Sequence, residues 1–266
     1  MNILFIGDVV GKPGRDAVKY FIENNAESLG LDFIIANLEN ASHGKGLQKN
    51  HFIEMMESGI DVVTMGNHTF AKKTINEFIG DYDNLLRPFN IHPSLLGHGS
   101  EVYEVNGLKI RVTNLIGRVF MSDNNDNPFD ALKSIVDNDN IDIHIVDFHA
   151  EATGEKQSLG YAFDGSVSAV IGTHTHIQTN DLRLLPKGTL YLSDVGMCGP
   201  RNGILGSSRE EVIRRTWTGS HEVFDVMNDH EYIFNGVLFT IDESTKKIVD
   251  YQLINEIIKK KEINNG

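Results

Sequence analysis

The N-terminal quarter of the chain alternates short apolar runs with segments of helical spacing. The apolar runs cover residues 2–10, 32–40 and 61–68, and the helical segments between them cover residues 16–29 and 48–58. Glycines stand where each of these helices should end. Short runs that are apolar throughout are typical of strands buried on both faces, and helices between them allow the strands to run parallel. The pattern therefore predicts an α/β sheet with parallel members.

The rest of the chain adds strands of a different kind. Residues 101–115 contain two alternating runs joined by Asn106-Gly107, which indicates a β-hairpin. A helix is expected near 154–163. Further strands are expected within residues 141–151, 167–176, 189–196, 236–243 and 247–254. We therefore expect two packed mixed sheets with outer helices. They should form a single domain over residues 1–266, because the sequence contains no repeat or linker.

Polar residues of the kinds that bind metals follow five of these apolar runs. Since the carboxyl ends of neighbouring strands in α/β sheets meet at one crevice, these side chains should lie together. Side chains alternate along a strand, so His174 and His176 are expected to point the same way, opposite to Thr173 and Thr175. The residues concerned are Asp8, Glu39, Asn40, Asn67, His68, His149, His174 and His176.

This set of residues favours metal binding over an incidental grouping of polar side chains. Imidazole nitrogens together with carboxylate and amide oxygens suit Mn, Fe, Zn or similar ions. Without His68, seven candidate ligands remain, too many for one tetrahedral ion. They suit two ions that share a bridging group, and the two oxygens of Glu39 could bridge. Ion pairs about 3.5–4 Å apart are typical of enzymes that displace groups at phosphorus.

The same motifs carry a family resemblance. The chain resembles the calcineurin-like metallophosphoesterase superfamily in Gly7-Asp8, Gly66-Asn67-His68, His149 and the run from Gly172 to His176. It departs from the usual Asp-x-His at Asp8-Val9-Val10 and from the usual Gly-Asp at Leu38-Glu39-Asn40. These departures resemble the YmdB-like bacterial branch, together with the stretches GDVVGKPGR, NLENASHGKG, MGNHTF, DFHAEATGEK and GTHTHIQT.

The resemblance implies a fold, an activity and a role for each residue. The fold would be a four-layer α/β sandwich of two mixed sheets flanked by helices. The activity would be a phosphodiesterase acting on 2′,3′-cyclic nucleotides, with Fe or Mn favoured over Zn. Asn40 would take the place of the histidine missing after Asp8, and His68 would be the general acid. The first ion would be held by Asp8, Glu39, Asn40 and His176, and the second by Glu39, Asn67, His149 and His174.

Composition limits the partners. The net charge of −13 argues against long nucleic acid, although not against short oligonucleotides, so a small phosphodiester is the expected partner. No stretch approaches the roughly 20 apolar residues of a membrane span, and the N-terminus does not resemble a signal peptide. The single cysteine, Cys198, fits a reducing compartment, so we expect a cytoplasmic protein. A homo-oligomer is compatible with the sequence.

Alternative interpretations remain open from the sequence. A metal-dependent amidohydrolase also uses His-x-His, but usually at its first strand. A regulator that binds a nucleotide without turnover is a second alternative, and a phosphomonoesterase or nuclease is a third. Residues 11–15 are expected to form a flexible turn and residues 196–206 a loop. Whether Lys12, Arg15, Arg201 or Asn202 contacts substrate is left open, and Cys198 is expected to be a packed apolar residue.

Overall fold

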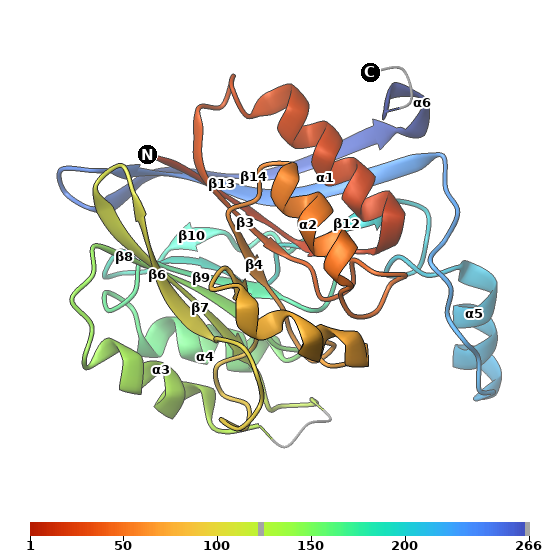
Figure 1. Ribbon diagram of the computed structural model, residues 1–266, viewed down its shortest axis with the longest axis horizontal. Helices are drawn as coiled ribbons and strands as arrows, with labels where there is room; N and C mark the ends of the chain where they lie inside the picture. The colour runs from red at the N-terminus through yellow and green to blue at the C-terminus, as the bar shows by residue number, and fades with distance from the viewer. Residues whose placement is uncertain (122–124, 264–266) are drawn as a thin grey trace.

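The computed structural model describes residues 1–121 and 125–263, in which two β-sheets pack face to face with helices outside them (Figure 1). The predicted four-layer α/β sandwich is confirmed. That residues 1–266 form a single domain stays a prediction. No helix among the described residues is long and apolar enough to cross a membrane.

The first sheet contains the N-terminal strands. Its order is β2-β12-β13-β1-β3-β4-β5, with β14 paired to β13. Strands β1, β3, β4 and β5 run parallel, as predicted, whereas β13 is antiparallel to β1, β12 and β14. The strands are β1 (Asn2–Ile6), β2 (Asp8–Val9), β3 (Leu31–Asn37), β4 (Val62–Thr64), β5 (Leu85–Leu86), β12 (Met197–Pro200), β13 (Glu231–Asp242) and β14 (Lys247–Lys259).

The second sheet has the order β10-β11-β9-β8-β7-β6. Its centre is parallel, and the antiparallel strands β6 and β10 lie at its edges. Asn106 and Gly107 both have positive φ between β6 and β7, so the predicted hairpin is confirmed. The strands are β6 (Ser100–Val105), β7 (Leu108–Ile116), β8 (Ile143–His149), β9 (Ala169–Thr173), β10 (Arg183–Leu184) and β11 (Leu190–Leu192).

The helices divide between the outer faces of the two sheets. Helices α1 and α2 supply apolar side chains to the outer core of the first sheet, whereas α3 and α4 supply that of the second. Helix α5 contributes no buried residue and stands away from both sheets (Figure 1). The helices are α1 (Gly11–Asn25), α2 (Lys49–Glu57), α3 (Pro128–Val136), α4 (Thr153–Ala162), α5 (Arg209–Thr218) and α6 (Lys260–Ile263), with 3₁₀ turns η1 (Lys73–Glu77) and η2 (Ile79–Asp81).

Alternation along β1 shows how the layers are built. Leu4 and Ile6 face the helices α1 and α2, whereas Ile3 and Phe5 face the second sheet. The core between the sheets therefore receives side chains from both. This packing sets the carboxyl ends of β1, β3 and β4 beside those of β8 and β9, which is where the polar residues of the sequence lie.

Two local predictions were wrong. Helix α1 begins at Gly11 and ends at Asn25, so residues 11–15 are helical rather than a flexible turn. Pro13 is tolerated because a helix leaves its first N–H groups unbonded, and Gly14 is needed because a Cβ there would lie 2.4 Å from the carbonyl oxygen of Cys198. Within the expected loop 196–206, residues 197–200 form β12.

Candidate metal centre

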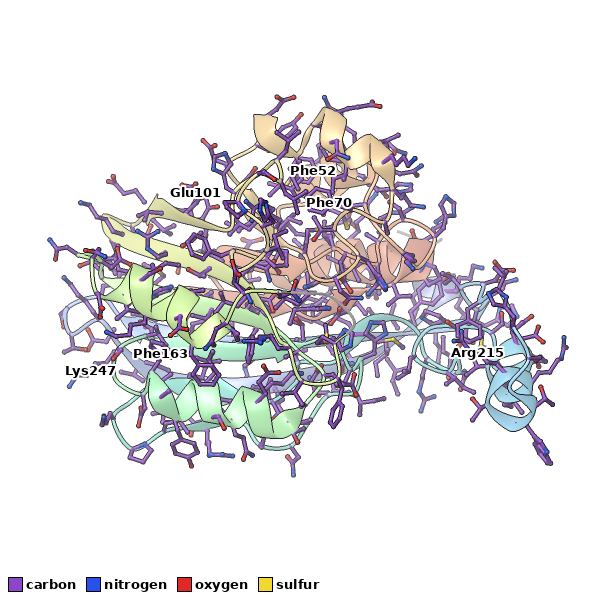
Figure 2. All side chains as sticks on the ribbon, turned by 90° about the horizontal axis from the view of Figure 1, so that it is seen from below. Phe52, Phe70, Glu101, Phe163, Arg215 and Lys247 are labelled. Carbon is purple, nitrogen blue, oxygen red and sulfur yellow. The ribbon has the colours of Figure 1, made fainter. Side chains whose placement is uncertain are left out.

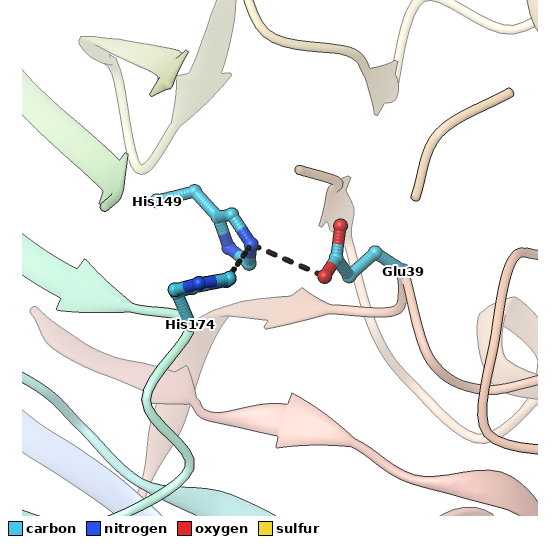
Figure 3. Close-up of side chains that lie close together, drawn as sticks. All are labelled: Glu39, His149 and His174. Atoms are coloured by element: carbon cyan, nitrogen blue, oxygen red, sulfur yellow. Dashed lines mark hydrogen bonds and ion pairs between the residues drawn. The ribbon is translucent and has the colours of Figure 1, made fainter. Parts of the chain in front are cut away.

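Three predicted ligands from both sheets meet at one point. Glu39 follows β3, His149 ends β8 and His174 follows β9. Figure 3 shows the two imidazole rings and the carboxylate pointing toward one another. Their candidate ligand atoms all lie within 4.8 Å of one another, which is close enough for one ion to contact all three.

His149 lies at the centre of this group. Its Nε2 is 3.1 Å from Oε1 of Glu39, 3.0 Å from Oδ1 of Asn67 and 3.0 Å from Nδ1 of His174. His149 and Glu39 are almost completely buried. The structure therefore brings together the four residues expected to hold the second ion.

Asp8 and His176 lie beside this group. Nε2 of His176 is 3.7 Å from Oδ1 of Asp8, and Nδ2 of Asn40 is 3.2 Å from the same nitrogen. Oδ1 of Asp8 is buried and has no hydrogen-bond partner among the described residues, while Oδ2 accepts a hydrogen bond from the backbone N–H of His174. A buried carboxylate oxygen without a donor is costly, so a cation at this position fits the donor set.

The backbone that carries the histidine pair is not a strand. Strand β9 ends at Thr173, and His174 and His176 have φ of 102° and 65°. The expectation that strand alternation aligns the two rings was therefore wrong.

Buried polar contacts hold this turn instead. Nζ of Lys156 donates to the carbonyl of Thr173 and to Asp194. The carboxylate of Asp194 in turn accepts from the backbone N–H of Thr175. These contacts fix backbone angles that non-glycine residues rarely adopt.

Gly66 lets the turn after β4 approach the centre. A Cβ at this position would lie 2.3 Å from Cδ2 of His149 and 2.5 Å from Oε2 of Glu39. The same carboxylate oxygen accepts a 2.8 Å hydrogen bond from the backbone N–H of His68. The Gly-Asn-His motif thus combines a close backbone approach at Gly66 with an amide oxygen from Asn67.

His68 lies beside Asn40. Nδ1 of His68 is 2.9 Å from Oδ1 of Asn40, and its side chain is partly exposed to the cleft. Burial lowers the pKa of His68 below its usual value, although Glu39 opposes this shift. Because Oδ1 of Asn40 faces His68, binding a cation through this oxygen would require the carboxamide to turn over.

His149 and His176 face the centre with Nε2, and each has a further contact at Nδ1. Nδ1 of His149 is 2.9 Å from Oγ1 of Thr173, which donates a 2.7 Å hydrogen bond to Asp147. The hydroxyl proton is therefore committed to Asp147, so Nδ1 of His149 donates to Thr173, and in the neutral imidazole the lone pair for a metal ion lies on Nε2. Nδ1 of His176 is 3.0 Å from the carbonyl oxygen of Leu205. Such contacts orient metal-binding imidazoles.

The charges of the centre also favour a cation. Burial alone would raise the pKa of Glu39, but the charge of His149 and its hydrogen bond lower it to about 2. Conversely, burial would lower the pKa of His149, but Glu39 and Asp8 raise it to about 9. Burial also raises the pKa of Asp8. The buried carboxylates thus attract positive charge to the position of His149.

A cleft of about 570 Å³ opens over the centre. Its floor includes Glu39, Asn40, His174 and His176. Several residues in the walls of the cleft were not predicted from the sequence, because they come from loops whose spacing carries no periodic signal. These wall residues are His43, Lys45, Glu151, Val223, Phe224 and Val226.

The residues left open by the sequence lie away from the cleft. Lys12 pairs with Asp16 on the surface. Arg15 is buried between Glu54 and the carbonyl of Ala41. Arg201 binds Glu231 and Asn202 binds Asp229, two acidic residues near the start of β13.

Cys198 is buried in β12, as expected for a packed apolar residue. Burial raises the pKa of its thiol to about 12.

Comparison with known proteins identifies the family. A protein-family model described as "YmdB-like protein" matches residues 4–254 of this chain. A 2′,3′-cyclic-nucleotide 2′-phosphodiesterase of Bacillus subtilis is 46% identical over 259 residues, covering 96% of this chain and 98% of that protein.

Two solved structures are also similar over nearly their whole length. A phosphatase from Mycoplasma pneumoniae is 40% identical with a TM-score of 0.93, covering 100% of this chain and 96% of that one. A hypothetical protein from Thermus thermophilus is 35% identical with a TM-score of 0.91, covering 97% of this chain and 99% of that one. The chain therefore belongs to the YmdB-like family of the calcineurin-like metallophosphoesterases.

Proposed function

We propose that this protein is a metal-dependent phosphodiesterase that hydrolyses 2′,3′-cyclic nucleotides. The observation that carries the proposal is the convergence of candidate ligands from five strand ends, of which Glu39, Asn40, His174 and His176 line one cleft beside His68. The name of the Bacillus subtilis relative supports the choice of substrate.

We assign Asp8, Glu39, Asn40 and His176 to one ion and Glu39, Asn67, His149 and His174 to the other. Oδ1 of Asp8, which has no hydrogen-bond partner within residues 1–121 and 125–263, and the positive charge drawn to His149 support a site for cations. Oxygen donors outnumber the imidazoles in this set, which favours Fe or Mn over Zn. Bound ions supply Lewis-acid chemistry, since they lower the pKa of water and offset the charge of phosphate oxygens.

His68 is suited to the proton transfer. Its ring lies beside Asn40 and borders the cleft. In the cationic form it can donate a proton from Nε2 to the ribose oxygen that leaves phosphorus. Imidazole ordinarily titrates near neutral pH, and burial lowers the pKa of His68 below that value, so its cationic form is a stronger proton donor.

Lys45 borders the cleft on the side of His68. Its ammonium group adds a positive charge where an anionic substrate must enter a chain of net charge −13.

A second candidate function has its own support. A groove of about 570 Å³ on the other side of His68 shares Lys45 and His68 with the cleft and is also bordered by Asn67, His92 and Asn125. This continuation could hold a further nucleotide. It favours a short oligonucleotide as the alternative substrate, with regulation through nucleotide binding as the corresponding role.

The proposed partner is a small phosphodiester, without long nucleic acid or membrane. The buried thiol of Cys198 is compatible with the reducing cytoplasm, where we propose that the protein works. A homo-oligomer remains compatible with this proposal.

A substrate panel tests the function. Purified protein should hydrolyse 2′,3′-cyclic AMP faster than 3′,5′-cyclic AMP, nucleoside monophosphates or dinucleotides, and a chelator should abolish the activity until Mn²⁺ or Fe²⁺ is restored. Turnover that survives complete metal removal would exclude the proposed mechanism. Faster cleavage of dinucleotides would favour the alternative.

Metal content tests the bridging role of Glu39. Two ions per chain are expected, and Glu39→Gln should lower the content of both, because it removes a charge that both ions share. Asn40→Ala removes a neutral ligand of one ion and should cost less. Elemental analysis of both variants, purified in parallel, gives the comparison. Equal losses would remove the bridging assignment.

His68→Ala tests the general acid. The variant should keep its metal and lose roughly 10²–10⁴-fold in turnover of 2′,3′-cyclic AMP. Bis-p-nitrophenyl phosphate releases a stable anion that hardly needs a proton, so its turnover should fall much less. If both substrates lose activity equally with metal retained, His68 positions phosphate instead. Loss of metal would make it a ligand.

Thr173→Val tests the contact that orients His149. The change keeps the volume of the side chain but removes the hydroxyl between His149 and Asp147. Metal affinity should fall roughly 10–100-fold in competition with a chelator. Thr173→Ser is the matched control, and it should bind metal nearly as the unaltered protein does. Unchanged affinity in the valine variant would contradict the orienting role.

A further inference from the structure

We propose that the apolar wall of the cleft binds the nucleobase of the substrate, with Phe224 as the stacking residue. This inference rests on the proposed function, because it assigns part of the same cleft. The wall belongs to residues 201–230, here called the arm, which connect β12 to β13 and include α5.

The residues that line the cleft fall into two chemically different sets. One set comprises the charged and polar residues of the metal centre, and the other comprises Leu205, Val223, Phe224 and Val226 from the arm. A charged phosphate ester gains little from contact with an apolar surface, whereas a planar base can stack on one. Within a cyclic nucleotide the two parts are joined by the ribose, so a substrate seated at the metal centre would present its base to a neighbouring wall.

The arm is fixed to the metal centre at its base. A Cβ on Gly11 or Gly44 would lie 3.0 Å or 2.8 Å from the methyl groups of Val226, so both glycines allow close packing of this valine. The backbone N–H of Met227 donates to the carbonyl of Gly206, and that of Ser208 donates to the carbonyl of Asp225.

The neighbouring carbonyl of Leu205 contacts Nδ1 of His176 at 3.0 Å. The two ends of the arm are therefore bonded to each other and to a candidate ligand. This arrangement gives the wall a defined position relative to the reacting centre.

Phe224 is held as a stacking surface. Phe224 is 39% exposed and borders the cleft. The guanidinium carbon of Arg215 lies 5.2 Å from the ring centroid, and Arg215 is not among the residues that line the cleft. Figure 2 shows Arg215 on α5, which stands clear of the two sheets. Arg215 thus packs against the ring from outside the cleft. The part of Phe224 that borders the cleft is available to a ligand.

Phe224→Ala tests the inference by comparing two substrates. One is 2′,3′-cyclic AMP, and the other is methyl riboside 2′,3′-cyclic phosphate, which has the same reacting group without a base. Stacking of one base on an aromatic side chain predicts a roughly 5–100-fold fall in the ratio of their kcat/KM values, mainly because KM should rise for the substrate that carries the base. Phe224→Trp should restore the ratio, and Phe224→Leu should not.

Trp217→Ala is the matched control. Trp217 is another aromatic residue of the arm, is 85% exposed and does not line the cleft, so the ratio should not change. Metal content and Tm of every variant are measured alongside. If the alanine variant does not fold, the leucine and tryptophan variants decide. An unchanged ratio in folded variants would overturn the inference.

The inference and the proposed function can fail separately. Hydrolysis of both substrates at equal efficiency by the unaltered protein would reject base recognition but keep the cyclic phosphodiesterase. Hydrolysis of neither would reject the proposed function. In that case calorimetric titration with 3′-AMP and with ribose 3-phosphate still compares ligands with and without a base, and equal affinities would overturn the stacking role.

Discussion

The structure depends on how the carboxyl groups of Glu39 and Asp8 are accommodated in the buried region where the two sheets meet. Taking a carboxylate out of water is costly unless positive charge or hydrogen-bond donors accompany it. His149 and the backbone N–H of His68 surround Glu39 and lower its pKa to about 2. Oδ1 of Asp8 has no such partner among the described residues. A cation beside Oδ1 of Asp8, as we propose, would supply the missing partner.

This constraint accounts for features that are otherwise unrelated. Gly66 is required because any side chain there would collide with His149 and Glu39. The buried pair of Lys156 and Asp194 is costly by itself, but it holds the turn that carries His174 and His176. The arm then borders the same centre. Rigid contacts behind the ligands leave the cleft above them to determine the substrate.

The sequence was sufficient to predict the layers and the candidate ligands, because both follow local rules. A buried strand is apolar along its length, and Asp8 and Glu39 stand where such runs end. The conformation at His174 and His176 was not predictable, since it depends on Lys156 and Asp194, whose side chains reach the turn only in the folded chain. The wall at Phe224 was missed because it comes from a loop whose spacing carries no periodic signal.

Anomalous diffraction from crystals of the metal-loaded protein would test the central claim most directly. Data collected at the absorption edges of iron and manganese would place each ion and identify its element. The account predicts two peaks about 3.5–4 Å apart, with one carboxylate oxygen of Glu39 in contact with each or shared between them. A single peak, or two peaks of which neither contacts Glu39, would contradict it.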